Sequence, residues 1–400
     1  MTPRRLLPLL ALALLPVGAA RGFDVVLNAQ GEFLDAYLVN GQPFPPKKVF
    51  IDPDPADPAS LGTPPRVGRH VNGRVCFFPH GIRHNGQFVI ADDTYREACV
   101  DENPPQARCR VRQRRSPFFV GKDVDGWGVF RSDGTWTRQH LHVARKFVEP
   151  LPQGAIDPQG CLFDDRGRLW TNDVGHGSFT ATDGSLIVFF PGPNHRYSKF
   201  CFVDKALSTP GMPVMDEAGN VYVPEPARGK ITKFAPPFPA SPRDCRNDAH
   251  LVTTPPTKTV FLSGHGIPLS MLRVPGSDHW YVASVIGPPA IDEFDASGNF
   301  VRNIVPPNVP KNPIGMDVGA AGTLYYAEVN LDPATLVDTR CGSVSMVRFD
   351  ASGQPMAPEL LGRHLSFPDG VTVVDSSQLG IDPRTLPAAV EPDASTCGGE

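Results

Sequence analysis

The sequence lacks the excess of positive charge that proteins binding nucleic acids carry. Its 38 lysines and arginines are offset by 42 aspartates and glutamates, which gives a formal net charge of −4. A protein that binds phosphate backbones needs a basic stripe or a basic domain. We therefore expect no nucleic-acid partner.

Long apolar runs and long amphipathic helical patterns are also missing. The apolar stretch from Leu6 to Val17 has about a dozen residues, whereas a membrane span needs roughly 20. It follows Arg4 and Arg5 and precedes the small residues 18–20, as in an export signal. We expect a signal peptide over 1–20, no membrane span, and a secreted or periplasmic mature chain, 21–400, that forms one domain. The alternative is a buried N-terminal helix.

Familiar catalytic motifs are absent. The sequence has no Gly-x-Ser-x-Gly elbow, no Walker loop, no dinucleotide fingerprint and no His-Glu-x-x-His. None of its eight cysteines forms a Cys-x-x-Cys pair, and export favours disulfides over metal ligation. Cys99 and Cys109 flank a short polar loop and are expected to pair locally. Cys161 is either paired or a free buried thiol, and the other connectivity stays open.

A short phrase with a glycine followed by apolar residues recurs six times. Its glycines are Gly81, Gly160, Gly211, Gly266, Gly315 and Gly370. Their spacings are 79, 51, 55, 49 and 55 residues, close to the length of one four-stranded propeller blade. The high content of glycine (38) and proline (45) suits many strands joined by tight turns.

Further runs complete each repeat. Apolar runs bounded by Gly, Asn or Asp predict second strands at 86–92, 167–173, 219–225, 278–284 and 322–328. Hairpin turns follow at 130–136, 291–300 and 347–353. Because the N-terminal hairpin at 25–34 lacks inner strands and the last phrase lacks a hairpin, we expect these ends to pair. The predicted fold is an all-β, six-bladed β-propeller closed by its N- and C-terminal strands.

Three segments fall outside this repeat. The proline-dense range 40–76 is expected to be an irregular excursion, 94–117 an insertion loop, and 376–400 a tail tied by Cys397. The long interval from Gly81 to Gly160 leaves seven blades as the alternative to six.

Two of the repeats carry a family resemblance. Residues 160–173 and 211–223 resemble the NHL-repeat propellers and the related senescence marker protein/gluconolactonase group, and the likeness extends over most of 77–375. The resemblance implies a propeller fold. It says little about activity, because this architecture hosts many unrelated functions.

The residue before each glycine is expected to ring the mouth of the central channel. At this position His80 and His265 face each other, with Asp369 and Gln159 on the blades beside His80. Two imidazoles and a carboxylate suit zinc or another divalent transition ion better than calcium, which prefers oxygen ligands. The alternative is that these side chains hydrogen-bond to backbone in the turns.

Two further resemblances concern these turns. Phe78-Pro79-His80-Gly81 and Gly264-His265-Gly266 resemble the zinc-histidine turns of the peptidylglycine amidating lyase propeller. Pro368-Asp369-Gly370 resembles the turn of the gluconolactonase group, whose aspartate is a metal ligand and base. These resemblances imply a metal-dependent lyase or lactonase.

Acidic residues close several of the predicted second strands. Glu225 and Glu328 end two of them, and Arg228 follows the first. Carboxylates near a partly closed channel suit acid–base catalysis, and an arginine suits an anionic substrate group. The alternative is that they only cap the next turn.

We therefore expect an exported, monomeric, metal-dependent hydrolase or lyase acting on a small lactone or ester. His80, His265, Asp369 and Gln159 would bind the metal, and Glu225, Glu328 and Arg228 would be catalytic. The alternative is a non-catalytic NHL-type binding module for a glycan, a peptide or a protein.

Overall fold

The computed structural model confirms the all-β class. It describes residues 23–30, 33–39, 47–51, 71–78, 87–92, 126–134, 136–141, 143, 158–175, 182–193, 196–332, 339, 341–365, 368–386 and 388. These residues form strands, turns and short 3₁₀ helices. None of the helices in this part of the chain is long and apolar enough to cross a membrane.

The described strands form six antiparallel sheets of four, which we number I to VI. Sheet I contains β24 (Pro368–Asp375), β1 (Asp24–Gln30), β2 (Phe33–Val39) and β3 (Lys47–Ile51). Sheet II contains β4 (Val71–Phe78), β5 (Gln87–Asp92), β6 (Gly126–Arg131) and β7 (Trp136–Leu141). Sheet III contains β8 (Pro158–Phe163), β9 (Leu169–Asp173), β10 (Gly184–Pro191) and β11 (Tyr197–Leu207).

The remaining three sheets follow in chain order. Sheet IV contains β12 (Val214–Met215), β13 (Val221–Glu225), β14 (Lys230–Ala235) and β15 (Thr257–Ser263). Sheet V contains β16 (Pro268–Arg273), β17 (Trp280–Ser284), β18 (Ala290–Phe294) and β19 (Phe300–Val305). Sheet VI contains β20 (Pro313–Val318), β21 (Leu324–Glu328), β22 (Gly342–Val347) and β23 (Glu359–Leu365).

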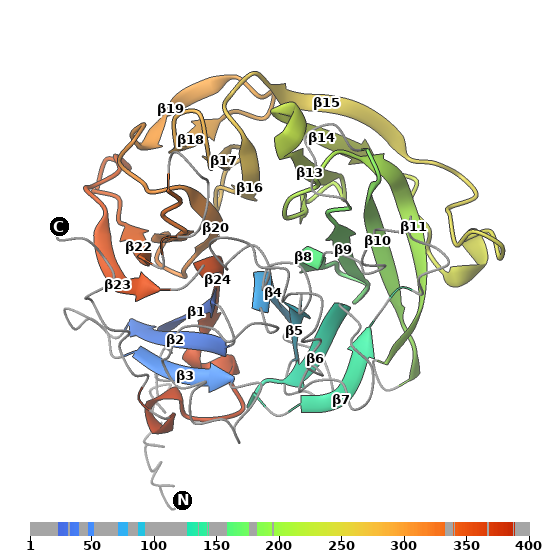
Figure 1. Cartoon of the computed structure of the whole chain (residues 1–400), viewed down its shortest axis with the longest axis horizontal. Coiled ribbons are helices and arrows are strands. Elements are labelled where there is room, and N and C mark those ends of the chain that lie inside the picture. Colours follow the sequence, from blue (N-terminus) through green and yellow to red (C-terminus); the bar gives the residue numbers. More distant parts are fainter. Residues whose placement is uncertain are drawn as a thin grey trace, which may run out of the picture.

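The sheets stand around a common centre (Figure 1), with β4, β8, β16, β20 and β24 nearest to it. A separate apolar cluster lies between each sheet and the next, including one between sheets VI and I and one between I and II. Each sheet is therefore buried on both faces.

Burial on both faces explains the almost continuous apolar runs in the sequence. In β21, Leu324 and Tyr326 pack toward sheet V, whereas Tyr325 and Ala327 pack toward sheet I. Successive side chains of a strand point to opposite faces, so a strand covered on both sides has no polar alternation.

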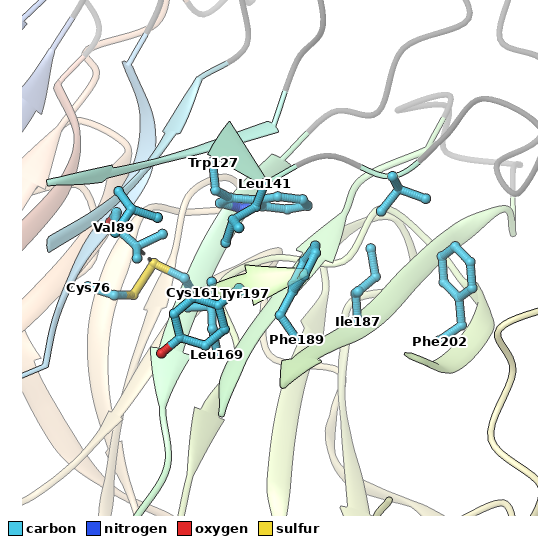
Figure 2. Close-up of a cluster of buried hydrophobic side chains, with 12 residues drawn as sticks. Cys76, Val89, Trp127, Leu141, Cys161, Leu169, Ile187, Phe189, Tyr197 and Phe202 are labelled. Carbon is cyan, nitrogen blue, oxygen red and sulfur yellow. Dashed lines mark hydrogen bonds between the residues drawn. A yellow bond between two sulfur atoms is a disulfide. The ribbon is translucent and has the colours of Figure 1, made fainter. Parts of the chain in front are cut away.

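The cluster between sheets II and III contains a disulfide. Cys76 of β4 is bonded to Cys161 of β8, and Trp127 meets Phe189 edge-on at 5.5 Å beside them (Figure 2). Cys161 is thus paired and not a free thiol. A second disulfide joins Cys201 to Cys245, and Cys341 is also disulfide-bonded. The predicted Cys99–Cys109 pair lies outside the described residues.

Both ends of the chain contribute to sheet I. β1 pairs antiparallel with β24, from Asp24 opposite Asp375 to Gln30 opposite Pro368. Phe23 and Ser376 extend this contact through two hydrogen bonds of 2.9 and 3.0 Å. Part of the range expected to be a tail continues from there as η7 (Ser376–Gln378) and η8 (Pro383–Thr385), with Leu379 and Leu386 in the cluster between sheets I and II.

The structure differs from the sequence prediction in the range 40–76, which contains β3 and most of β4. The β-branched and aromatic residues of Lys47–Ile51 and Val71–Phe78 favour strands in spite of the nearby prolines. The first strand of sheet II consequently comes before the Gly81 phrase, whereas the repeat predicts that each glycine phrase forms the first inner strand of its blade.

A second difference concerns sheet V. Pro268 pairs with the last residue of β17 as Pro158 and Pro313 do in their sheets. Counting from these prolines, Ser270 stands where sheets III and VI have glycine, and the Gly266 phrase precedes the strand. A bend rich in glycine fits the connecting loop as well as it fits a strand start.

Candidate functional site

Two glutamates end the second strands of sheets IV and VI and bind the loop that leads into the same sheet. The Oε2 atom of Glu225 accepts a hydrogen bond from the Ser208 amide at 3.0 Å, and that of Glu328 accepts one from the Lys311 amide at 2.6 Å. In both cases the donor lies 17 residues earlier. The next residue in each loop has positive φ, 51° at Thr209 and 62° at Asn312. The carboxylates thus stabilise two strained loops of similar shape.

The other oxygen of each glutamate binds a hydroxyl on the third strand. Oε1 of Glu225 accepts from the Thr232 hydroxyl, and Oε1 of Glu328 accepts from the Ser345 hydroxyl at 2.9 Å. Thr232 and Ser345 occupy the same register position relative to their glutamates. Both side chains thus bind the loop before their own sheet and the third strand, whereas the capping alternative placed their bonds in the turn that follows.

One neighbour distinguishes the two glutamates. Lys230 pairs with Glu225 in the strand register, and its Nζ lies 2.9 Å from Oε1, whereas Ser343 occupies this position opposite Glu328. Burial would raise the pKa of Glu225, but bonds from Thr232 and Lys230 lower it overall. Burial raises the pKa of Glu328, and its uncharged donors do not offset that rise.

The backbone of Glu328 lies close to the start of β24, the strand that contains Asp369. Gly342 opens β22, and a Cβ atom there would lie 2.6 Å from the Glu328 carbonyl oxygen and 2.5 Å from Cδ of Pro368. Asp369 follows that proline in β24 and is fully buried. Glu328 and Asp369 thus belong to two strands, β21 and β24, that approach each other where sheets VI and I meet.

Close approach of the inner strands explains the glycines of the sequence phrase. A Cβ atom on Gly315 would lie 2.6 Å from the Gly370 Cα atom, and one on Gly160 would lie 2.7 Å from that of Met212. Real Cβ atoms do not approach so closely, so only glycine fits.

Gln159 and Asp369 stand at equivalent positions, one residue after the first proline of β8 and β24. Both strands flank β4 near the centre of the ring (Figure 1). The Oε1 atom of Gln159 is buried, and no donor in the described part of the chain bonds to it. A buried acceptor without a donor is uncommon and indicates room for a ligand or a water molecule.

The two histidines predicted as metal ligands are not seen together. His80 lies outside the described residues. The His265 ring packs edge-on against Phe294 of β18 at 4.9 Å, beside Asp292. Burial raises the pKa of Asp292, an effect that Asn303 and the nearby His265 partly offset. His265 belongs to the loop before β16, which explains its contact with the third strand of sheet V.

The described donors do not by themselves fit a transition-metal site. Over the ranges that the structure covers, no three His, Cys, Asp or Glu side chains come together as ligands. Glu225 and Glu328 are already bonded to the loops. The metal site with His80, His265, Asp369 and Gln159 stays a prediction.

Arg228 lies at the same end of the molecule as Glu225. It is the last residue of η5 (Pro226–Arg228), which directly follows β13, and it is exposed. In the portion of the chain described, it makes no ion pair. Its guanidinium is therefore available to an anionic group.

An apolar cluster, here called the apolar rim, was missed by the sequence analysis. It joins the starts of the inner strands and the ends of the second strands in sheets IV, V and VI. Its members are Met212, Ile267, Leu269, Val285, Ile286, Ile314, Val329 and Leu331. The sequence did contain a signal for the apolar rim, because apolar residues continue past the ends of β17 and β21 as Val285-Ile286 and Val329.

Comparison with known proteins finds no matching family model and no matching curated protein. Similar solved structures include a protein of unknown function from Bacteroides caccae, with 11% identity, 88% of this chain and 99% of that chain covered, and a TM-score of 0.49. A gluconolactonase from Xanthomonas campestris has 13% identity, coverage of 91% and 93%, and a TM-score of 0.45.

Virginiamycin B lyase from Staphylococcus aureus, in a structure with quinupristin, has 11% identity, coverage of 84% of each chain, and a TM-score of 0.42. All three scores lie below 0.5, so the description of the fold depends on the chain's own sheets. The resemblance noted in the sequence is confirmed in that gluconolactonases and a lyase are among the solved structures to which this chain is similar.

Proposed function

We propose that the chain is a six-bladed β-propeller, closed by the pairing of β1 with β24, that hydrolyses or eliminates a small lactone or ester. The six sheets, their ring of apolar clusters and the β1–β24 register support this architecture. The active site is proposed at the end where inner strands begin and second strands end, since Glu328, Asp369 and Gln159 all belong to that end.

The observation that carries the proposal is the environment of the Glu328 side chain. It is buried, burial raises its pKa, and among the described residues it has no cationic partner of the kind that Lys230 gives to Glu225. A carboxyl group with a raised pKa is suited to proton transfer near neutral pH. Glu225, whose pKa is lowered, is proposed to be structural instead.

In hydrolysis the Glu328 carboxylate takes a proton from water while the water oxygen bonds to the ester carbonyl carbon. The bond from that carbon to the leaving oxygen then breaks, and the proton passes from Glu328 to the leaving alkoxide. In elimination the same carboxylate removes a proton from the carbon next to the one that bears the leaving oxygen. The carbon–oxygen bond then breaks, a carbon–carbon double bond forms, and Glu328 returns the proton to the leaving oxygen. Arg228 holds an anionic group where the substrate has one.

Two matched variants test this assignment, with a panel of lactones and esters as substrates. Glu328→Gln should lower kcat by about 10²–10⁴-fold, because it removes the proton acceptor. Glu225→Gln should keep kcat within about tenfold once its folded fraction is accounted for. Equal activity of wild type and Glu328→Gln would contradict the role of Glu328.

A third variant tests the cause. Ser343→Lys places an ammonium group where Lys230 stands in sheet IV and should lower the pKa of Glu328. The acidic limb of the pH–kcat profile should move to lower pH. If the acidic limb of the profile did not move, the group that titrates in it would not be Glu328.

Metal dependence is a separate proposal, with His80, His265, Asp369 and Gln159 as ligands of a zinc-like ion. When bound, such an ion would polarise the carbonyl or acidify water. Metal analysis of the purified chain tests it: a near-stoichiometric transition ion should be lost in a His80→Ala, His265→Ala double variant. Full activity with chelator and no bound metal would contradict it.

A non-catalytic binding module remains the second candidate. The observation in its favour is that both glutamates hold loops in place, which makes the face a rigid platform. Binding of lactones or esters without turnover would favour this function.

We also propose that the chain is exported and monomeric. The disulfides of the described residues support an oxidising compartment. Sequencing the N-terminus of protein recovered from outside the cytosol should give a start near Arg21, and light scattering should give a single-chain mass.

A further inference from the structure

We propose that the ligand of this site is amphipathic, an ester or lactone with an alkyl or aryl substituent, and not a sugar lactone. This inference rests on the proposed function for the position of the site. It adds the chemical class of the substrate, which follows from how polar and apolar residues divide around the ring.

The apolar rim belongs to the same end of the molecule as Glu225 and Glu328. The Met212 amide donates to the Leu269 carbonyl at 3.1 Å, which joins sheets IV and V. The Ser270 hydroxyl donates to the Ile314 carbonyl, which joins sheets V and VI. These contacts place the rim at the starts of three consecutive inner strands.

Loop contacts fix the remaining members beside these strands. The Ile267 amide donates to the Ile286 carbonyl at 3.1 Å, just past the end of β17. The Leu331 amide donates to Oδ1 of Asn312 at 2.9 Å, and Nδ2 of the same asparagine donates to the Val285 carbonyl at 2.8 Å. Asn312 thus connects sheets V and VI across the rim.

Polarity changes around the ring at equivalent strand positions. Gln159 in sheet III and Asp369 in sheet I are polar, whereas Leu269 in sheet V and Ile314 in sheet VI are apolar. One side of the site can therefore hydrogen-bond, and the other side offers hydrocarbon.

Part of the apolar rim is accessible. Ile267, Leu269, Ile286 and Leu331 are only half-buried, although they pack on four buried members of the cluster. Apolar side chains with residual exposure beside a polar site suit the apolar part of a ligand, because covering them removes hydrocarbon from water. A sugar would leave its hydroxyl groups there without partners.

The test uses the full-length protein and a series of γ-lactones with alkyl substituents of increasing length, with gluconolactone as the polar reference. Dissociation constants are measured by calorimetry and turnover by acid release. We expect affinity to rise up to about fourfold per added methylene, equivalent to about 0.8 kcal/mol, until the rim is covered.

Ile286→Ser should flatten this dependence on chain length. Val260→Ser is the matched control, since Val260 is an exposed residue of β15 outside the rim, and it should leave the dependence unchanged. Leu269→Ser gives a second, independent disruption should Ile286→Ser fold poorly, with circular dichroism as the folding control.

The outcomes separate this inference from the proposed function. Turnover of gluconolactone in preference to alkyl lactones, or affinity that is independent of chain length, would overturn the inference and leave the hydrolase. Chain-length-dependent binding without turnover would support the inference and contradict the hydrolase. Absence of both binding and turnover would overturn both.

Discussion

At the residue scale, two glutamates with the same backbone role have pKa values shifted in opposite directions, and Lys230 beside Glu225 is the charged neighbour that distinguishes them. Glu225 is bonded to Lys230, and Glu328 faces Ser343 at the same register position. A carboxylate beside an ammonium is stabilised in its ionised form, whereas burial alone favours the protonated form. Local chemistry, and not strand geometry, is the basis for the proposal that one glutamate is structural and the other transfers protons.

The two glutamates should have opposite effects on stability as pH changes. The folded pKa of Glu328 is raised above its ordinary value of 4.5, so its stabilising contribution is complete below pH 4.5 and is lost as pH rises through the folded pKa. The Glu328→Gln variant does not lose stability in this way, because glutamine does not ionise. Its free energy of unfolding should therefore rise relative to wild type as pH increases above 4.5.

Glu225 should behave in the reverse sense. Its folded pKa is lowered, so its contribution is present above 4.5 and is lost as pH falls through the folded pKa. The advantage of wild type over Glu225→Gln should shrink as pH falls below 4.5. Urea unfolding of both variants from about pH 3 to about pH 8 checks the pair. Parallel curves for the two variants would contradict the assignment of opposite shifts.

At the element scale, neighbouring sheets require glycine where their inner strands meet. Replacing Gly315 with alanine would push a methyl group into Gly370. We expect Gly315→Ala to lower the free energy of unfolding by about 1–3 kcal/mol, the usual cost of overpacking. Urea unfolding measures the loss.

A turn glycine provides the control for Gly315→Ala. Gly322 has a φ of +79° and no heavy atom within 4 Å of its Cβ position. Because asparagine tolerates this conformation, Gly322→Asn should cost under about 1 kcal/mol. Equal losses in the two variants would mean that close packing is not what excludes a side chain at Gly315.

Strand β1 should contribute to stability through its contacts with sheet VI as well as through pairing with β24. Oδ2 of Asp24 accepts a hydrogen bond from the Tyr325 hydroxyl at 3.2 Å, and Oδ1 accepts one from the Ala320 amide at 3.4 Å. Asp24→Ala would leave a buried hydroxyl without its acceptor, at a cost of about 1–3 kcal/mol.

The exposed residue Asp248 serves as the control, and Asp248→Ala should change the free energy by less than about 0.5 kcal/mol. Thermal and urea unfolding of both variants measure the difference. A loss in Asp24→Ala no larger than in Asp248→Ala would show that this contact does not secure β1 to sheet VI.

At the scale of the whole molecule, covalent links join adjacent sheets. The Cys76–Cys161 disulfide spans 85 residues and connects sheets II and III near the centre, and Cys201–Cys245 spans 44 residues. Removing a link that closes a long loop increases the entropy of the unfolded chain. We expect the Cys76→Ala, Cys161→Ala double variant to lose about 3–5 kcal/mol.

The double variant Cys201→Ala, Cys245→Ala should lose somewhat less, by about 0.5 kcal/mol, on loop length alone. Unfolding in urea without reductant measures both. A larger loss from the shorter link would mean that packing around the sulfur atoms, and not chain entropy, dominates.

Much of the strand pattern could be predicted from local sequence. The runs at 219–225 and 322–328 contain β13 and β21 as expected, because apolar residues bounded by Gly, Asn or Asp define a short strand by themselves. β4 ends before the Gly81 phrase and β16 begins after the Gly266 phrase, so neither phrase starts the first strand of its sheet as predicted. Pairing with the second strand was needed to place these first strands.

The candidate site was predictable only in part. Glu225 and Glu328 were selected correctly as strand ends, but the register that brings Lys230 to one and Ser343 to the other comes from strand pairing. The apolar rim was not found, because its members are spread from Met212 to Leu331 and become neighbours only when three sheets assemble.

By itself, the sequence determined the class of the fold and the order of most strands, because strand propensity and turn chemistry act between residues close in the chain. Tertiary structure alone decided how far each carboxyl group is removed from water and which side of the ring is apolar. Burial at a residue depends on neighbours that arrive from other sheets, such as Pro368 near the Glu328 backbone. No local pattern encodes those neighbours.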